Sequence, residues 1–94
     1  MRKIEILVDR DDLNELYDLF DLHGIIGYSV VDITEGRGAK RGSTLPQPFA
    51  GQHGVLVFSV CDVAQADALL GSLRAFLAAH KGFAFATPVD AVIV

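Results

Sequence analysis

The 94-residue sequence contains a single cysteine and no long hydrophobic run. Because one thiol cannot form an intramolecular disulfide, Cys61 excludes a disulfide-stapled fold and favours a reducing, cytoplasmic compartment. No apolar stretch approaches the ~18 residues that a membrane span requires, so we expect no direct membrane insertion. The opening MRKIEILVDRDD alternates and then turns acidic, which is the pattern of neither a signal peptide nor a transit peptide.

Basic residues are scarce in the first third of the chain and gather in one segment. The net charge is −4, with nine acids against three basic residues in 1–35, whereas 36–52 holds three basic residues and no acid. An acidic body argues against a nucleic-acid surface, which needs basic residues along a face. The basic segment indicates an anionic small molecule or an acidic patch on a partner protein, and a merely solvated loop explains it equally well.

Alternation of apolar residues predicts strands at 2–8, 25–34 and 54–61, and a fourth strand at 89–94 that begins after Pro88. Apolar residues make up 51% of the chain. This is high for a small domain that is soluble as a monomer, and burial in an oligomer interface accounts for the excess.

Helical spacing of apolar residues predicts two helices, one over 13–22 and one over 63–81. Gly24 suits the position after the first helix, because glycine adopts a positive φ without strain. Two pairs of residues have the spacing of a capping box: Asp12 with Glu15, and Asp62 with Gln65. The spacing therefore predicts where both helices begin.

The element order is strand, helix, strand, strand, helix, strand, which describes a ferredoxin-like α+β sandwich (βαββαβ) over a single domain, 1–94. We expect a four-stranded antiparallel sheet with both helices on one face. The other face, bearing Tyr28 and Val30 or their alternates, is left uncovered, so copies of the chain would bury it. The segment 36–52 then forms a long loop between strands two and three, and loops of this length are usually functional or disordered.

No catalytic or metal-binding motif is evident, so we expect no enzyme activity and no metal site. Cys61 precedes a predicted helix, where a thiolate is stabilised, but no motif places a histidine beside it and a buried thiol is expected. The histidines at 23, 53 and 80 are far apart, and none has the spacing of a metal-ligand pair. We expect them to cap elements or to face solvent.

The glycine-rich basic cluster at the start of the loop is the best candidate for binding chemistry. Gly36 and Gly38 let backbone N–H groups approach an anion, and Arg37, Lys40 and Arg41 supply charged donors. The cluster fits neither the phosphate-binding P-loop nor the dinucleotide fingerprint, since both of these open a helix.

The stretch GIIGYSVVDI (24–33), followed by this cluster, resembles the second strand and the beginning of the T-loop in PII signal-transduction proteins. The opening MRKIE is similar too, and GYSVVD is most similar to the PII-like proteins associated with bicarbonate transport and carboxysomes. The resemblance implies a homotrimer with ligand clefts between subunits, adenine nucleotides as ligands, and a T-loop that docks on a membrane transporter or an enzyme.

The resemblance also implies site residues. Ser29 matches the position that meets the adenine, and residues 79–85 stand where the family has its phosphate-holding B-loop, whose glycine- and charge-rich pattern is missing here. The predicted ligand residues are Ser29, Gly36, Arg37, Gly38, Lys40, Arg41, Gly42, Lys81 and Gly82. The ligand stays open between AMP, ADP, ATP and bicarbonate, or no nucleotide at all.

Two other functions remain open from the residues. The first is a ligand-independent protein-binding module, whose contact surface is Pro46, Pro48 and Phe49; these residues also form the predicted partner surface of a PII-like sensor. The second is a divalent-metal-binding trimer of the related copper-tolerance type, which would use His53 or His23 near the threefold axis. Metal content and partner capture distinguish the two.

Overall fold

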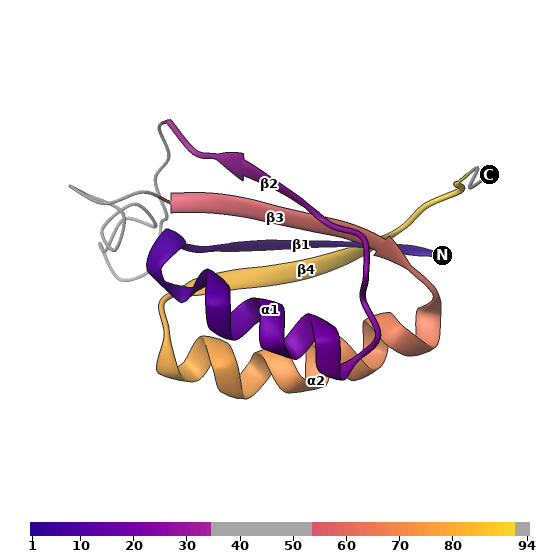
Figure 1. The fold of residues 1–94 in the computed structure, drawn as a ribbon. Helices are drawn as coiled ribbons and strands as arrows, with labels where there is room; N and C mark the ends of the chain where they lie inside the picture. Colours follow the sequence, from indigo (N-terminus) through magenta and orange to yellow (C-terminus); the bar gives the residue numbers. More distant parts are fainter. Residues whose placement is uncertain (35–53, 92–94) are drawn as a thin grey trace.

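Two helices cover one face of a four-stranded sheet in the computed structural model (Figure 1). The structure describes residues 1–34 and 54–91. The elements are β1 (Arg2–Asp9), the 3₁₀ turn η1 (Arg10–Asp12), α1 (Leu13–Leu22), β2 (Ser29–Asp32), β3 (Gly54–Cys61), α2 (Val63–Ala79) and β4 (Gly82–Pro88). The strand order is β2-β3-β1-β4 and every pairing is antiparallel. The predicted ferredoxin-like sandwich is therefore confirmed.

The prediction for the fourth strand was wrong. β4 begins at Gly82 and ends at Pro88, and it pairs along its length with β1. Residues 89–91 are not in a strand, although the Val89 N–H donates to the Met1 carbonyl at 3.1 Å; 92–94 lie outside the described residues. Proline is tolerated at the end of an edge strand because the ladder needs no N–H there, so Pro88 ends the strand instead of beginning it.

The capping prediction for α1 was also wrong. Asp12 makes no capping hydrogen bond; instead the Asp9 carboxylate accepts from the Asp11 N–H at 2.9 Å and caps η1. A 3₁₀ turn thus intervenes between β1 and α1, and it moves the cap three residues toward the N-terminus. Because the Asp12 side chain does not cap the helix, it can contact a different part of the chain.

The start of α2 and the end of α1 follow the sequence. Asp62 caps α2 in a capping box: its carboxylate accepts from the Gln65 N–H at 2.7 Å, and the Gln65 side chain accepts from the Asp62 N–H at 3.4 Å. Gly24 follows α1 with φ 71°. α2 ends at Ala79, two residues before the predicted Lys81. β2 is likewise shorter than the predicted 25–34.

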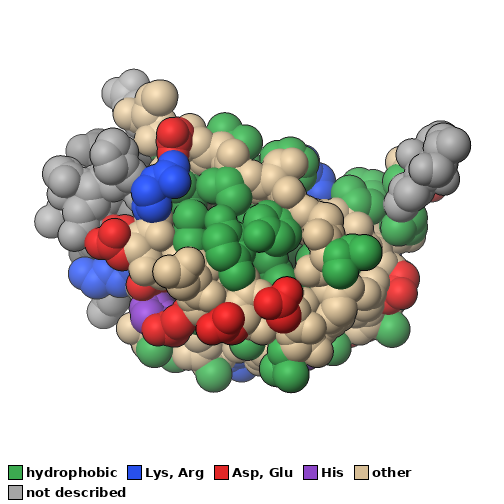
Figure 2. Space-filling model, viewed as in Figure 1, with side chains coloured by type: hydrophobic (Ala, Val, Ile, Leu, Met, Phe, Trp, Pro, Cys, Tyr) green, Lys and Arg blue, Asp and Glu red, His purple; other side chains and the backbone are tan. Residues whose placement is uncertain are grey.

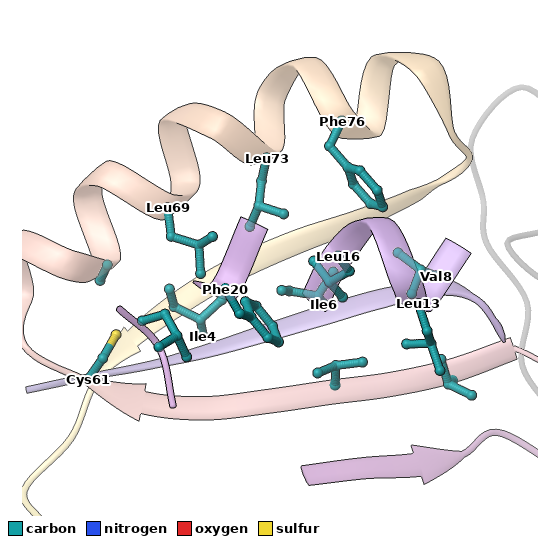
Figure 3. Packing of buried hydrophobic residues seen from close by; sticks show 14 residues of the cluster. Ile4, Ile6, Val8, Leu13, Leu16, Phe20, Cys61, Leu69, Leu73 and Phe76 are labelled. Atoms are coloured by element: carbon teal, nitrogen blue, oxygen red, sulfur yellow. The ribbon is translucent and has the colours of Figure 1, made fainter. Parts of the chain in front are cut away.

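The core lies between the sheet and the helices (Figure 3). Alternate side chains of β1 and β3 point at the helices, and α1 and α2 each bury one apolar stripe against them. The fully buried large side chains are Ile4, Ile6, Val8, Leu16, Phe20, Val55, Val57, Leu69 and Leu73. Burying one such side chain stabilises the fold by about 1.5–3 kcal/mol, so this cluster fixes the scaffold that carries the loop.

The opposite face of the sheet is apolar and carries no described element. The register aligns Val31 with Leu56, Leu56 with Leu7, and Leu7 with Phe83, so one apolar row crosses all four strands. The prediction for this face was either Tyr28 and Val30 or the residues that alternate with them, and the alternating residues lie there. Tyr28 lies on the helix side, where its ring stacks on Tyr17 at 4.9 Å between centroids.

Candidate ligand site at the loop end of the sheet

One end of the sheet gathers the elements that the sequence assigned to ligand binding. β2 ends and β3 begins at this end, where α1 begins and α2 turns into β4 (Figure 1). The register confirms the proximity, because β1 pairs Asp9 with Gly54 on one side and Val8 with Gly82 on the other. The base of the loop and the turn at 80–82 therefore flank the same end of β1.

Part of the predicted site lies within the described residues. Ser29 is the first residue of β2 and is exposed, Lys81 is exposed, and Gly82 is half-buried as the first residue of β4. Several predicted residues fall in 35–53, outside the described part of the chain: Gly36, Arg37, Gly38, Lys40, Arg41, Gly42, Pro46, Pro48, Phe49 and the alternative metal ligand His53. Their roles stay predictions.

One chain does not bring Ser29 and Lys81 together. β2 and β4 are the two edges of the sheet, with β3 and β1 between them. Three strand spacings separate the edges by about 14 Å. A small-molecule site that joins residues of both edges is therefore not expected within one chain.

Gly82 has a steric role that the sequence did not reveal. Its φ is 145°, and a Cβ at this position would lie 2.1 Å from the carbonyl oxygen of Leu7. Only glycine fits where β4 starts this close to the β1 backbone. The glycine is thus explained by strand pairing, and its contact with a ligand stays a prediction.

Arg10 forms an ion pair with Asp32, which joins η1 to the end of β2. Both side chains are exposed, so the pair contributes about 0–1 kcal/mol to stability. The Ile33 N–H donates to the Gly54 carbonyl at 2.9 Å and extends the pairing of β2 with β3 beyond Asp32. These two contacts hold the end of β2 against η1 and β3.

His80 lies between two carboxylates at the same end of the molecule. Its Nδ1 is 3.0 Å from Asp12 Oδ1 and its Nε2 is 2.8 Å from Glu15 Oε2, while its ring packs on Phe76 with centroids 4.6 Å apart. The side chain is 22% exposed. Sequence analysis missed this cluster, because 65 residues separate Glu15 from His80 and no local pattern connects them.

Burial raises the pKa of Asp12 above its usual value, and the attraction of His80 partly offsets that rise. The neighbouring acids Asp9, Glu15 and Asp11 raise the pKa of Asp12 further. Each of these carboxylates disfavours a negative charge on Asp12.

The described residues show no further constellation for chemistry. Cys61 is buried, as predicted, and burial together with Asp62 raises the pKa of its thiol, which disfavours the nucleophilic thiolate. A ring nitrogen of His23 lies 2.7 Å from Ser72 Oγ. Within 1–34 and 54–91, histidine, cysteine and acidic side chains form no group of three suited to a metal ion.

No described helix is long and apolar enough to cross a membrane.

Several solved structures share this fold at low sequence identity. CPII, a nitrogen regulatory PII-like protein from Thiomonas intermedia K12 bound to ADP, AMP and bicarbonate, is 20% identical with a TM-score of 0.79, over 99% of this chain and 93% of that one. The same protein bound to ADP and bicarbonate matches with 21% identity and a TM-score of 0.73, over 92% and 82%. A putative PII-like signaling protein from Thermus thermophilus is 17% identical with a TM-score of 0.67, over 92% and 83%.

At such low sequence identity, the solved structures show the fold alone. No curated protein matches the chain. The family model for nitrogen regulatory protein P-II, in contrast, matches residues 1–94, which is the whole sequence. The match agrees with the resemblance that the GIIGYSVVDI stretch predicted. The chain therefore belongs to the nitrogen regulatory protein P-II family.

Proposed function

We propose that this protein is a PII-like sensor that catalyses no reaction. It binds a small anionic ligand, an adenine nucleotide or bicarbonate, in clefts between the subunits of a cytoplasmic homotrimer. The loop 36–52 then controls a partner, which is a membrane transporter or an enzyme. The observation that carries the proposal is the position of the described site residues on opposite edges of one sheet, since only neighbouring copies complete such a site.

The uncovered sheet face supports assembly of copies. Val31, Phe83 and Phe85 lie on this face with 48%, 42% and 40% of their surfaces exposed. Exposed apolar surface that spans four strands is typical of a protein–protein interface. Burial of this face between subunits would also account for the high apolar content of the chain.

Charges on the uncovered face are paired in a way that permits burial. Lys3 Nζ lies 3.7 Å from Glu5 Oε1 and 4.9 Å from the centroid of the Phe58 ring. The register places Glu5 between Phe58 and Phe85. A cation that already has a carboxylate and an aromatic ring as partners costs less to desolvate than an isolated one.

Charge and the solved relatives support the choice of ligand. CPII was solved bound to ADP, AMP and bicarbonate, which are all anions. In this chain Lys81 is exposed at the turn into β4, and the predicted basic cluster begins after β2. Between neighbouring copies, these positive groups would face one cleft and attract an anion.

Titration calorimetry with AMP, ADP, ATP and bicarbonate tests ligand binding. We expect saturable heat with at least one of them, and weaker binding for Arg37→Ala and Lys81→Ala. Arg74→Ala is the matched control, because it removes an exposed positive charge from α2 instead. No heat with any of the four ligands would overturn the sensor function, and partner capture lost in Phe49→Ala would then favour the ligand-independent module.

Sedimentation tests assembly separately from ligand binding. We expect the wild-type protein to sediment as a trimer and Phe85→Glu, on the uncovered face, to dissociate it. Leu22→Glu places the same charge on an exposed apolar residue at the end of α1 and should leave the trimer intact. A monomeric wild type, or a Phe85→Glu variant that remains trimeric, would contradict burial of this face.

A further inference from the structure

The histidine between the two helices contacts a carboxylate on each side of its ring. Both ring nitrogens of His80 face carboxylate oxygens, Nδ1 toward Asp12 at 3.0 Å and Nε2 toward Glu15 at 2.8 Å. A neutral imidazole carries one N–H and one lone pair, whereas the imidazolium donates from both nitrogens. Only the protonated ring can donate toward two ionised carboxylates at once, in a hydrogen bond to Glu15 and an ion pair with Asp12.

These contacts join parts of the chain that are far apart in sequence. Asp12 ends η1 and Glu15 lies in the first turn of α1, while His80 directly follows α2 and precedes the turn into β4. The His80 N–H donates to the Phe76 carbonyl at 3.0 Å, so the backbone of the histidine is held by the end of α2.

We propose that His80 is a pH-sensitive clasp, which fastens the turn from α2 into β4 to the start of α1 when its ring is protonated. On loss of the proton, one of the two carboxylates faces a lone pair and repels it. The contact on that side then opens, and the turn at 80–82 becomes less firmly held.

The charges that face the ring are negative. The groups that face His80 are Asp12 from η1 and Glu15 from α1, and α2 has no charged residue in its last turn. Asp9 and Asp11 add negative charge next to Asp12. The nearby cations are Arg10, which pairs with Asp32, and Lys81, which follows His80 in the sequence.

The clasp stands independently of any ligand, but its consequence for ligand binding rests on the proposed function. Lys81 is a predicted ligand residue and is covalently next to the clasp. If Lys81 binds an anion between subunits, then opening the clasp at higher pH loosens the position of its charge. Anion affinity would then fall as pH rises through the range of histidine titration.

Amide hydrogen exchange of the full chain tests the clasp at about pH 5.5 and about pH 8, on either side of the range where histidines ordinarily titrate. The readout is the protection factor of the residue 80 amide, which corrects for the intrinsic effect of pH on exchange. In the wild type we expect protection to fall about fivefold from the lower to the higher pH, as for one partly exposed ion-paired hydrogen bond. In His80→Gln we expect no such fall.

Two further variants keep the test decisive. His23→Gln removes another half-buried histidine, whose partner is the neutral Ser72 hydroxyl, and should retain the full pH dependence. Glu15→Gln removes one charge at an exposed position where folding is not at risk, and should reduce the dependence. The same pH dependence in His80→Gln as in the wild type, or its loss in His23→Gln, would overturn the clasp.

A ligand measurement separates the clasp from the proposed function. ADP is titrated into the wild type and into His80→Gln at both pH values. Weaker ADP binding at the higher pH in the wild type alone supports both proposals. Absence of ADP binding at either pH, with the exchange result intact, overturns ADP as the ligand and leaves the clasp standing.

Discussion

Gly82→Ala is expected to destabilise the fold severely, although the residue lies at the start of an edge strand. At φ 145° a side chain is strained by about 1–3 kcal/mol, and the added Cβ would lie 2.1 Å from the Leu7 carbonyl oxygen. That oxygen belongs to the β1 backbone, so relief requires β4 to move away from β1 and not merely a rotamer change. We expect the free energy of unfolding to fall by about 2–4 kcal/mol.

Gly71→Ala supplies the matched control. Gly71 lies in α2 and is exposed, and a methyl group added to its Cα would meet no described atom within 4 Å beyond its chain neighbours and the nearby backbone of its own helix. Alanine is a better helix former than glycine, so this variant should gain about 0.5–1 kcal/mol. The free energy of unfolding of both variants is measured by urea denaturation at one fixed protein concentration. The slope of this free energy against urea concentration should be unchanged. A Gly82→Ala variant whose free energy of unfolding lies within about 0.5 kcal/mol of the wild type would refute the steric explanation. Ligand binding would then be the only role left for Gly82.

Two further predictions concern the titrating groups. Burial raises the pKa of Asp12, so the contribution of Asp12 to stability is present below its unfolded pKa of 3.8 and is lost as pH rises through the folded pKa. Carboxyl NMR titration should show that the pKa of Asp12 rises further in His80→Gln and falls in Glu15→Gln. Shifts of the opposite signs would contradict this account. Burial raises the pKa of the Cys61 thiol, so a thiol-alkylating reagent near pH 8 should modify the folded protein far more slowly than the urea-unfolded protein. Equal rates in both states would show that Cys61 is accessible.

The fold was predictable because its elements are consistent with local patterns. Alternation on β1 and β3 and the apolar stripe of α1 each match one buried face in the structure. The error at β4 shows the limit of such patterns. The run from 83 to 87 alternates phenylalanine and threonine with alanine, and only its pairing with β1 distinguishes it from a connecting segment.

The surface of the molecule shows why charge patterns predicted less. Figure 2 shows acidic side chains along α1 below an exposed apolar area near β2. Arg10 is bound to Asp32, 22 residues away, and Asp12 and Glu15 are bound to a histidine at the far end of α2. Contacts of this kind depend on how the elements pack, which no local spacing encodes.

The sheet order gives the strongest physical reason to treat the ligand site as a property of an assembly. A site within one chain would need Ser29 and Lys81 to approach each other, yet β3 and β1 keep the edges about 14 Å apart in a sheet whose core is closely packed. In the proposed trimer, the two edges would meet across neighbouring copies. Dissociating the proposed trimer with Phe85→Glu should therefore abolish ligand binding even though every predicted ligand residue is retained. A monomeric Phe85→Glu variant that still binds ligand with wild-type affinity would show that the site lies within one chain, on the basic loop alone.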